Sequence, residues 1–337
     1  MKQYLDFYFL LKIYHKIKSR RLKIIGLAFA SKLGFRHLSL RIDPALSCNL
    51  MCKMCYFSNK EYRKTSRGSF SEQNMADIAR IFFPHALQVV LGCGAEPTIN
   101  NNFMLLLELA AKYKVPNIGL VTNGLLLREH HLVRMNQIGV NEIILSAHGL
   151  KKDTYESFMT NGHFEQFTKL LDTITLLNKD GKSLKLRINY TANSDNLDDL
   201  KLFKDYIEKY NISTIQVRPI MDIGGKYTKP INGEELKRYY HEINSLKERC
   251  TSNMVTLLAN TSDVSYQKAN NDGSLIESIY TYISPKTIQE LSLGTKVNSL
   301  SAYKKRTKWH KHLFSGLLSN KKSEDKFLKR SLKYDIQ

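Results

Sequence analysis

The sequence predicts an α/β protein built as an open, partial barrel. Short β-rich runs alternate with helical patterns from Leu38 onward, which is typical of parallel strands joined by helices. The alternation supplies six strands, fewer than the eight of a closed barrel. The chain has 337 residues, of which 42% are hydrophobic and 24% charged, so a sizeable core of globular composition is expected.

The six expected strands are short runs rich in aliphatic, β-branched and aromatic residues. They occupy residues 37–42, 87–92, 117–122, 141–147, 183–191 and 213–219. In a partial barrel, the ligand site is expected where the strands end, at their carboxyl edge. The polar and cysteine-containing segments of the chain follow these strand ends.

A helical pattern follows each expected strand. Ser71 is a suitable N-cap for the first helix, whose apolar positions include Met75 and Ile78. Gly139 and Gly181 are placed to end two later helices. The remaining helices are expected at residues 103–114, 125–139, 164–181, 197–210 and 233–249. The six units predict a partial (β/α)6 TIM-like barrel over residues 37–249.

Basic extensions flank the expected barrel. Residues 1–41 hold ten Lys/Arg and one acid, and Tyr4, Tyr8, Leu11 and Tyr14 recur at helical spacing. The extension 1–36 therefore either lies on an anionic membrane surface or packs on the barrel with a solvated basic face. In the extension 250–337, a short basic helix over residues 304–318 is expected to precede a disordered stretch.

The charge and cysteine content limit the partners and the compartment. Lys plus Arg is 51 and Asp plus Glu is 31, so the net charge is 51 − 31 = +20. This excess favours an anionic partner, although a solvated basic surface explains it too. Five cysteines, three of them clustered, fit a reducing cytoplasm. No run of about 20 apolar residues occurs. We expect a cytoplasmic protein, with peripheral contact at the inner face of the membrane as an option.

Three cysteines lie within eight residues, with the spacing C-x3-C-x2-C. Cys48, Cys52 and Cys55 can hold three irons of a [4Fe–4S] cluster and leave the fourth iron open to a small molecule. The alternative is a zinc ion whose fourth ligand is His37.

The segment CNLMCKMC (48–55) resembles the C-x3-C-x-φ-C signature of the radical S-adenosylmethionine (radical SAM) superfamily, with Met54 as the apolar φ residue. GCGAEP (92–97) is similar to the GGE motif of that family, and TNG (122–124) to the polar end of its third strand. The resemblance extends over residues 38–245 and includes SAHG (146–149), LRINYT (186–191) and VRPI (217–220).

The resemblance implies one [4Fe–4S] cluster on Cys48, Cys52 and Cys55, with S-adenosylmethionine (SAM) at its open iron. An electron from a flavodoxin- or ferredoxin-type donor then cleaves SAM to a 5′-deoxyadenosyl radical, which abstracts hydrogen from a substrate. The SAM contacts implied by the resemblance are Met54, Tyr56, Gly94, Ala95, Glu96, Asn123, Ser146, Arg187 and Asn189.

Some residues depart from the family pattern or admit a second interpretation. Ala95 replaces a glycine but keeps its backbone groups if its φ is negative. Only Cys250 follows the barrel, so an auxiliary cluster is not expected. Cys250 is a candidate hydrogen donor and His148 a candidate acid or base, each with a structural alternative. Cys93 is expected to be a buried apolar filler.

The substrate is left open by the sequence. The charge favours an anionic molecule: a sugar phosphate, a lipid-linked intermediate or nucleic acid, although no aromatic RNA-binding pattern is present. The alternatives are a peptide-modifying radical SAM enzyme and a non-catalytic metal-binding scaffold on the same barrel.

Overall fold

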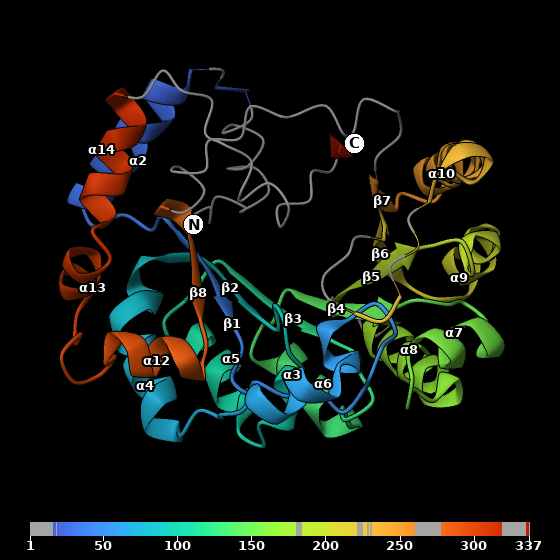
Figure 1. Ribbon diagram of the computed structural model, residues 1–337, viewed down its shortest axis with the longest axis horizontal. Coiled ribbons are helices and arrows are strands. Elements are labelled where there is room, and N and C mark those ends of the chain that lie inside the picture. The colour runs from blue at the N-terminus through green and yellow to red at the C-terminus, as the bar shows by residue number, and fades with distance from the viewer. Residues whose placement is uncertain are drawn as a thin grey trace. The chain divides into compact units, whose positions relative to one another are not determined.

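A computed structural model describes residues 16–17, 19–179, 184–220, 225–227, 229, 231–259, 278–318 and 335–336 (Figure 1). The chain divides into two compact units, each assembled from separate segments. The first unit comprises Met1–Ala45, Gly68–Gly119 and Lys268–Leu332, and the second comprises Leu46–Arg67, Leu120–Gln267 and Lys333–Gln337. Parts of both extensions belong to the first unit, with the first strands.

The first unit is built on parallel strands. β1 (Leu38–Ile42) pairs with β2 (Ala86–Leu91) on one side and with β8 (Tyr280–Ile283) on the other. β1 and β2 lie within one residue of their predicted positions. β8 was not predicted, because it has only four residues and lies in the polar C-terminal extension. That extension therefore supplies an edge strand of the sheet.

Six helices accompany these strands within the described part of the first unit. They are α2 (Arg20–Lys32), α4 (Glu72–Phe82), α5 (Phe103–Lys112), α12 (Pro285–Leu291), α13 (Leu300–Arg306) and α14 (Trp309–Leu318). Ser71 caps α4 as predicted, in a reciprocal capping box with Asn74. The expected helix 304–318 is two helices, which are separated by Thr307 and by Lys308 with φ 54°.

The second unit continues the βα pattern. β4 (Glu142–Ala147), β5 (Lys185–Ala192), β6 (Ile212–Pro219) and β7 (Thr256–Ala259) pair in parallel, and β9 (Asp335–Ile336) is antiparallel to β7. The first three match predicted strands, whereas β7 and β9 are additional. β3 (Asn117–Thr122), also predicted, lies where the chain passes from one unit to the other.

Helices again follow the strands of the second unit. They are α3 (Lys60–Thr65), α6 (Glu129–Gln137), α7 (Lys152–Phe158), α8 (Phe164–Lys179), α9 (Phe203–Lys209) and α10 (Gly233–Ser252). The expected helix 197–210 begins as a 3-10 helix, η4 (Leu197–Leu202), and continues as α9. Gly139 follows α6 with φ 80°, as predicted for a C′ glycine. Gly181 lies outside the described residues.

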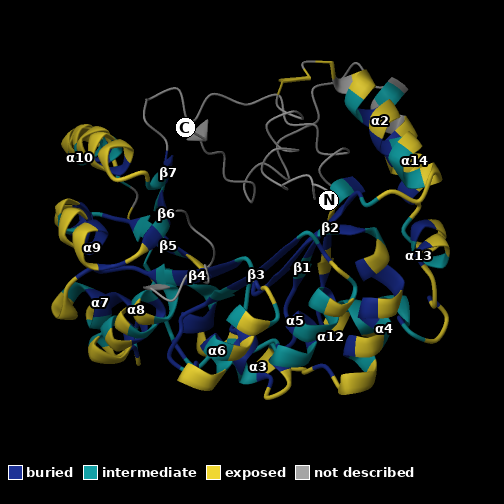
Figure 2. Ribbon diagram, turned by 180° about the vertical axis from the view of Figure 1, so that it is seen from behind, coloured by how far each residue is buried: buried dark blue, intermediate teal, exposed yellow. Residues whose placement is uncertain are grey.

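The two faces of the second unit's sheet differ in polarity. Ile188, Tyr190, Ile215 and Val217 are buried on one face, on the side where Figure 1 shows helices α7 to α10, and Figure 2 shows these strands as largely buried. The register aligns Ser146, Asn189 and Gln216 across three strands, on the other face. Polar side chains on the helix-free face are typical of a barrel interior that binds a ligand.

Within the described residues, no helix is long and apolar enough to cross a membrane. The tyrosines expected on an N-terminal helix (Tyr4, Tyr8 and Tyr14) lie outside the described residues, as does the segment 319–334 in which disorder was expected.

Candidate functional site

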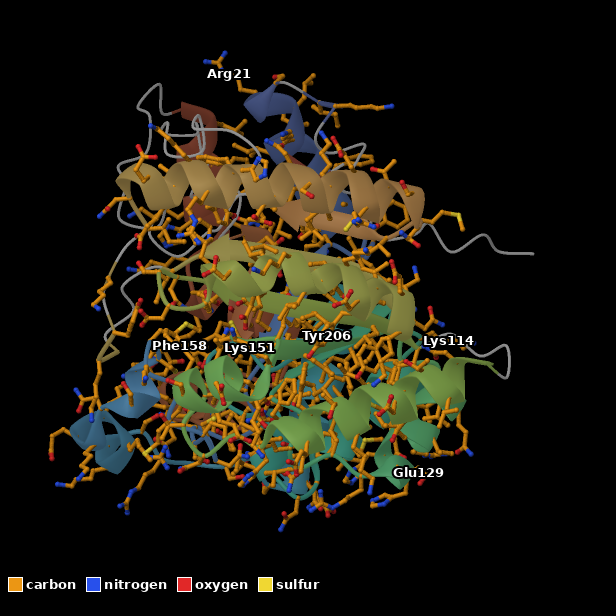
Figure 3. The ribbon with its side chains drawn as sticks, turned by 90° about the vertical axis from the view of Figure 1, so that its right-hand side faces the viewer. Arg21, Lys114, Glu129, Lys151, Phe158 and Tyr206 are labelled. Atoms are coloured by element: carbon orange, nitrogen blue, oxygen red, sulfur yellow. The ribbon has the colours of Figure 1, made fainter. Side chains whose placement is uncertain are left out.

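The cysteine loop is held by backbone hydrogen bonds within the second unit. The Met51 N–H donates to the Thr160 carbonyl over 3.0 Å, and the Lys53 N–H donates to the Phe158 carbonyl over 2.9 Å. Phe158 ends α7, whose first turn follows Lys151; both residues are labelled in Figure 3. The Cys55 N–H donates to the Cys52 carbonyl over 2.9 Å, and this turn brings the two cysteines close together. The loop conformation is therefore fixed by the protein backbone.

A short segment after β6 packs against the same loop. The Tyr227 N–H donates to the Lys53 carbonyl over 3.0 Å, and the Lys226 N–H donates to Ser58 Oγ over 3.1 Å. A Cβ atom at Gly225 would lie 2.2 Å from the backbone C and O of Met54. Gly225 is thus required by close backbone approach. Sequence reasoning missed this residue, although the Gly-Gly pair at 224–225 was a usable signal.

The Cys48 sulfur accepts hydrogen bonds from two directions. The Leu50 N–H lies 3.4 Å from Cys48 Sγ, and Asn123 Nδ2 lies 3.9 Å from it. Asn123 Nδ2 also donates to Asn49 Oδ1 over 2.8 Å, while its Oδ1 accepts from the Leu125 N–H. The TNG segment therefore supports the cysteine loop, rather than lying apart from it.

The three thiols fit the ligand set of an iron–sulfur cluster. All three are half-buried, they come from one loop, and N–H groups point at the sulfur of Cys48 and, from Phe57, at that of Cys55. Burial raises the pKa of Cys55, and the Phe57 N–H opposes that rise. N–H···S bonds of this kind stabilise cluster thiolates and tune the cluster potential.

The zinc alternative with His37 as ligand is not supported by the geometry. His37 Nδ1 lies 2.7 Å from the Phe35 carbonyl, and its Nε2 lies 3.0 Å from Lys304 Nζ. Both ring nitrogens are therefore engaged. In the part of the chain that the structure describes, no three His, Cys, Asp or Glu side chains surround a single-ion position.

The loop after β2, in the first unit, is organised by Asp43. The fully buried Asp43 carboxylate accepts the N–H groups of Cys93 (2.7 Å) and Gly94 (2.9 Å), and the Ala95 N–H also reaches it. The Tyr282 hydroxyl of β8 donates to the same carboxylate over 2.8 Å. Burial raises the pKa of Asp43, and these four donors oppose the rise.

Asp43 is a site residue that the sequence analysis did not identify. The signal was present: Asp43 directly follows Ile42, the apolar last residue of a predicted strand, where an unpaired carboxylate would be costly. Its partner Tyr282 could not have been found in the same way, because β8 was not predicted.

One expectation for this loop, the burial of Cys93, is corrected. Glu96 is buried and turned into its own loop, where Oε1 accepts from the Thr98 N–H (3.2 Å) and hydroxyl (2.6 Å). It caps the 3-10 helix η3 (Pro97–Ile99), a local role that the sequence did not indicate. Cys93 is exposed, not a buried filler. Gly94 and Ala95 are half-buried, and the φ of Ala95 is not positive, as its replacement of glycine requires.

The polar row on the sheet of the second unit contains two predicted residues. Ser146 and Asn189 are half-buried and lie opposite each other in the register, next to Gln216. The Asn189 Oδ1 atom is buried and has no hydrogen-bond partner among the described residues. Arg218 Nη2 lies 3.4 Å from Gln216 Oε1, which extends the row toward the carboxyl end of β6. An unsatisfied buried acceptor beside a cation suits a polar ligand.

Arg187 forms a largely buried ion pair with Glu142. Its guanidinium donates to both oxygens of Glu142, with Nη2 2.9 Å from Oε1 and 2.8 Å from Oε2, and both side chains are largely buried. Such a bidentate pair fixes β4 to β5. Glu142 begins β4, so the pair lies toward the amino ends of the strands, away from the edge where the ligand is expected.

His148 and Cys250 are both buried. Burial, with a contribution from Arg218, lowers the pKa of His148 to about 3, so the imidazole is neutral at physiological pH. Cys250 shares the buried stripe of α10 with Tyr239, Ile243 and Leu246, and burial raises its pKa to about 12. The placement of Cys250 suits a packing residue rather than a hydrogen donor.

Tyr56 and Met54 lie within or next to the cysteine loop. The Tyr56 ring contacts the rings of Tyr62 and Phe57, with centroids 4.6 Å and 5.1 Å away, in the 3-10 helix η1 (Tyr56–Ser58). Met54 is half-buried beside Gly225. Both residues are therefore placed by the loop itself.

Residues 42–188 match the family model of the radical SAM superfamily. This segment of the chain resembles a radical SAM domain. The matched segment includes the cysteine loop, the loop held by Asp43, and strands β2 to β4. Radical SAM proteins are enzymes that use a [4Fe–4S] cluster and SAM, which supports the predicted cofactors and the predicted enzyme class.

Curated relatives resemble part of the chain. It is 25% identical over 193 residues to a GTP 3′,8-cyclase of Synechocystis, covering 57% of this chain and 56% of that protein. It is 25% identical over 217 residues to a probable GTP 3′,8-cyclase of Methanocella arvoryzae, with 64% of each covered. The match to the Drosophila molybdenum cofactor biosynthesis protein 1 spans 25% of that protein. The chain thus spans less than two thirds of these relatives.

Solved structures share the fold. SuiB of Streptococcus suis bound to its precursor peptide SuiA gives a TM-score of 0.60 at 17% identity, covering 90% of this chain and 72% of SuiB. The anSMEcpe enzyme with AdoMet and a peptide gives 0.57 at 15% identity, covering 88% and 89%. The α/β partial-barrel fold class is thereby confirmed.

Proposed function

We propose that this chain is a radical SAM enzyme that reductively cleaves SAM and abstracts a hydrogen atom from an anionic substrate. The observation that carries the proposal is the cysteine loop: three thiols at C-x3-C-x2-C spacing, with N–H donors on the sulfurs of Cys48 and Cys55, inside a matched radical SAM segment. Cys48, Cys52 and Cys55 would each hold one iron.

The proposed SAM contacts divide into two groups. In the first unit the backbone of Gly94 and Ala95 is proposed to contact SAM. In the second unit the same is proposed of Met54, Tyr56, Ser146 and Asn189. Glu96, Asn123 and Arg187, whose side chains are bonded to Thr98, Asn49 and Glu142, would act by shaping these loops and strands. Asp43 and Tyr282 are proposed as positioning residues for the loop 93–95.

Three side chains, those of Asp43, His148 and Cys250, have stated roles in this proposal. Asp43 accepts the N–H groups of three successive residues, and the carbonyls of the same loop are proposed to accept from a ligand ammonium group. His148 stays neutral and would act as a hydrogen-bonding group rather than as a charged acid. Cys250, buried in α10, would act as a packing residue, with hydrogen donation as the alternative role.

The proposed substrate is anionic, either a sugar phosphate or a lipid-linked molecule, with nucleic acid as a further option. The support is the net charge of +20 and the placement of Arg218 at the polar row. A peptide substrate is the second candidate, since the solved SuiB and anSMEcpe structures hold peptides. The proposed electron donor is of flavodoxin or ferredoxin type, and the proposed location is the cytoplasm, at the inner membrane face.

The experiment is anaerobic reconstitution followed by a cleavage assay. The intact chain should bind about four irons and, with dithionite and SAM, release 5′-deoxyadenosine. Cys52→Ala should lose both properties, whereas Cys250→Ala should keep both. A chain that binds one zinc and no iron, or that holds the cluster without cleaving SAM, would instead support a non-catalytic metal-binding scaffold.

A further inference from the structure

We infer that helices α2 and α14 form a docking surface for an anionic lipid bilayer. This surface names the residues that would contact the membrane. It rests on the proposed function for the idea of a membrane-proximal substrate. It uses only side chains of the first unit that lie outside the cofactor loops.

The inner face of α2 is already occupied. Ile24 and Leu27 are buried and form a small core with Trp309 and Leu313 of α14. Figure 1 shows the two helices side by side. The Trp309 indole N–H donates to the Ser278 carbonyl over 3.0 Å, so the helix pair is anchored to the segment that leads into β8. α2 is therefore a fixed part of the first unit.

The opposite face of α2 is apolar and exposed. Leu22, Ile25, Phe29 and Leu33 recur every three or four residues, so they form one stripe. Their exposed fractions are 61%, 53%, 62% and 51%. Phe35, after the helix, and Phe314 of α14 are 60% and 51% exposed. In Figure 2 both helices carry exposed residues. Six large apolar side chains on one helix pair and its immediate continuation far exceed the scattered exposure usual at a protein surface.

Basic residues surround this apolar stripe, without acids. Residues 19–36 contain five Lys/Arg and no Asp or Glu, and residues 300–318 again contain five and none. Arg21 and Lys32 are exposed on α2, and Figure 3 shows Arg21 pointing away from the ribbon. Exposed cations on the second segment are Lys305, Arg306, Lys308 and Lys311.

An anionic bilayer can contact both the apolar stripe and the basic residues around it. Apolar side chains of an interfacial helix enter the boundary between headgroups and acyl chains by about 5–10 Å, while flanking lysines and arginines reach the headgroups. A second copy of the chain would bring the same positive charges face to face. Nucleic acid would satisfy the cations but leave the aliphatic stripe in water. The charge pattern therefore favours lipid.

The experiment is flotation of the full-length chain with lipid vesicles. It should float with vesicles of phosphatidylcholine and phosphatidylglycerol, remain at the bottom with phosphatidylcholine alone, and be released by high salt. Ile25→Ser/Phe29→Ser should weaken binding at least about tenfold, because it removes two inserted side chains. Arg21→Gln/Lys32→Gln should weaken it by about fivefold per charge.

Matched controls separate the surface from general effects. Leu176→Ser removes an apolar side chain of equal exposure (61%) on α8, and Lys112→Gln/Lys185→Gln removes two exposed charges elsewhere. Both control variants should float like the intact chain. All variants should retain iron and release 5′-deoxyadenosine, since none touches the cofactor loops.

Several results would overturn the inference. These are no flotation with anionic vesicles, equal flotation with neutral ones, or equal losses in the control variants. A dimer that Ile25→Ser/Phe29→Ser converts to monomer would assign the face to a second copy. If the chain floated only after deletion of residues 1–18, that segment would be assigned as the natural cover of the apolar face. A chain that floats but binds no iron would leave the surface standing and reject the proposed function instead.

Discussion

Asp43 shows how one buried carboxylate organises the loop 93–95. Its two oxygens accept backbone N–H groups from three consecutive residues, and a tyrosine hydroxyl besides. No neutral side chain has the same set of acceptors, since a carboxamide replaces one acceptor by a donor. The loop conformation therefore depends on Asp43 being a carboxylate.

Asp43→Asn should weaken SAM binding without removing the cluster. The new NH2 group would face backbone N–H donors, at a cost of about 1–3 kcal/mol for the unsatisfied groups, or roughly 5- to 150-fold in affinity. The measurement is the Kd of SAM for the reconstituted protein, with iron content determined in parallel. Asp153→Asn, at an exposed position of α7, is the control and should leave both unchanged. Unaltered SAM affinity in Asp43→Asn would remove Asp43 from the site.

Gly225→Ala should reduce iron incorporation. The added Cβ would meet the Met54 backbone at 2.2 Å, so the cysteine loop must shift to accept it. Iron per chain after reconstitution, and the cluster absorbance, are the measurements. Gly26→Ala is the matched control, because a Cβ there has no atom within 4 Å. Normal iron content in Gly225→Ala would show that the loop accommodates the methyl group.

At the level of elements, the extensions are joined to the sheet by a buried polar contact. Lys304 of α13 reaches Ser31 of α2 (2.5 Å) and His37 (3.0 Å), and it lies 4.4 Å from the Trp309 ring centroid. Because His37 Nδ1 donates to the Phe35 carbonyl, its Nε2 must accept from the lysine. A neutral imidazole is required for this arrangement.

The first unit should therefore lose stability in mild acid. Burial, assisted by Lys304, lowers the pKa of His37 from 6.5 to about 4. The unfolded chain takes up the proton below pH 6.5 and the folded chain only near pH 4. Stability is thus constant above pH 6.5 and falls between pH 6.5 and 4, by about 3 kcal/mol at most. Denaturant midpoints across this range test it: His37→Asn should flatten the dependence, and the exposed His310→Asn should not.

Sequence patterns predicted the elements according to their length. Strands of five or more residues were placed within two residues of their observed bounds, and β3 was placed to the residue. β7, β8 and β9 were missed, because two to four residues carry too little periodicity to identify. The cysteine loop could be assigned from the sequence because the C-x3-C-x2-C spacing itself indicates the chemistry of its ligands. Pairings such as Arg187 with Glu142 depend on strand register, which the sequence alone did not supply.

At the scale of the whole molecule, the net charge of +20 should act on encounter rates. An acidic flavodoxin is attracted over distances comparable to the Debye length, which shortens from about 14 Å to about 6 Å between 0.05 and 0.3 M salt. The fold itself is not expected to respond to such screening.

Cluster reduction by an acidic flavodoxin should therefore slow by at least about fivefold over that salt range. Stopped-flow absorbance of the cluster is the measurement. Reduction by dithionite, a small anion, is the control and should change much less. A flavodoxin rate independent of salt would mean that charge does not guide this encounter.

β8 has a consequence for the order in which the chain matures. It borders β1, and its Tyr282 reaches Asp43 across 239 residues of sequence. During synthesis from the N-terminus, β1 emerges early but keeps one unpaired edge, and the loop 93–95 lacks one of its supports, until residue 283 has left the ribosome. A nascent chain can thus present its cysteine loop long before the loop 93–95 has all its supports. Arrested chains that end before and after β8 should differ in SAM binding but not in their capacity to hold iron.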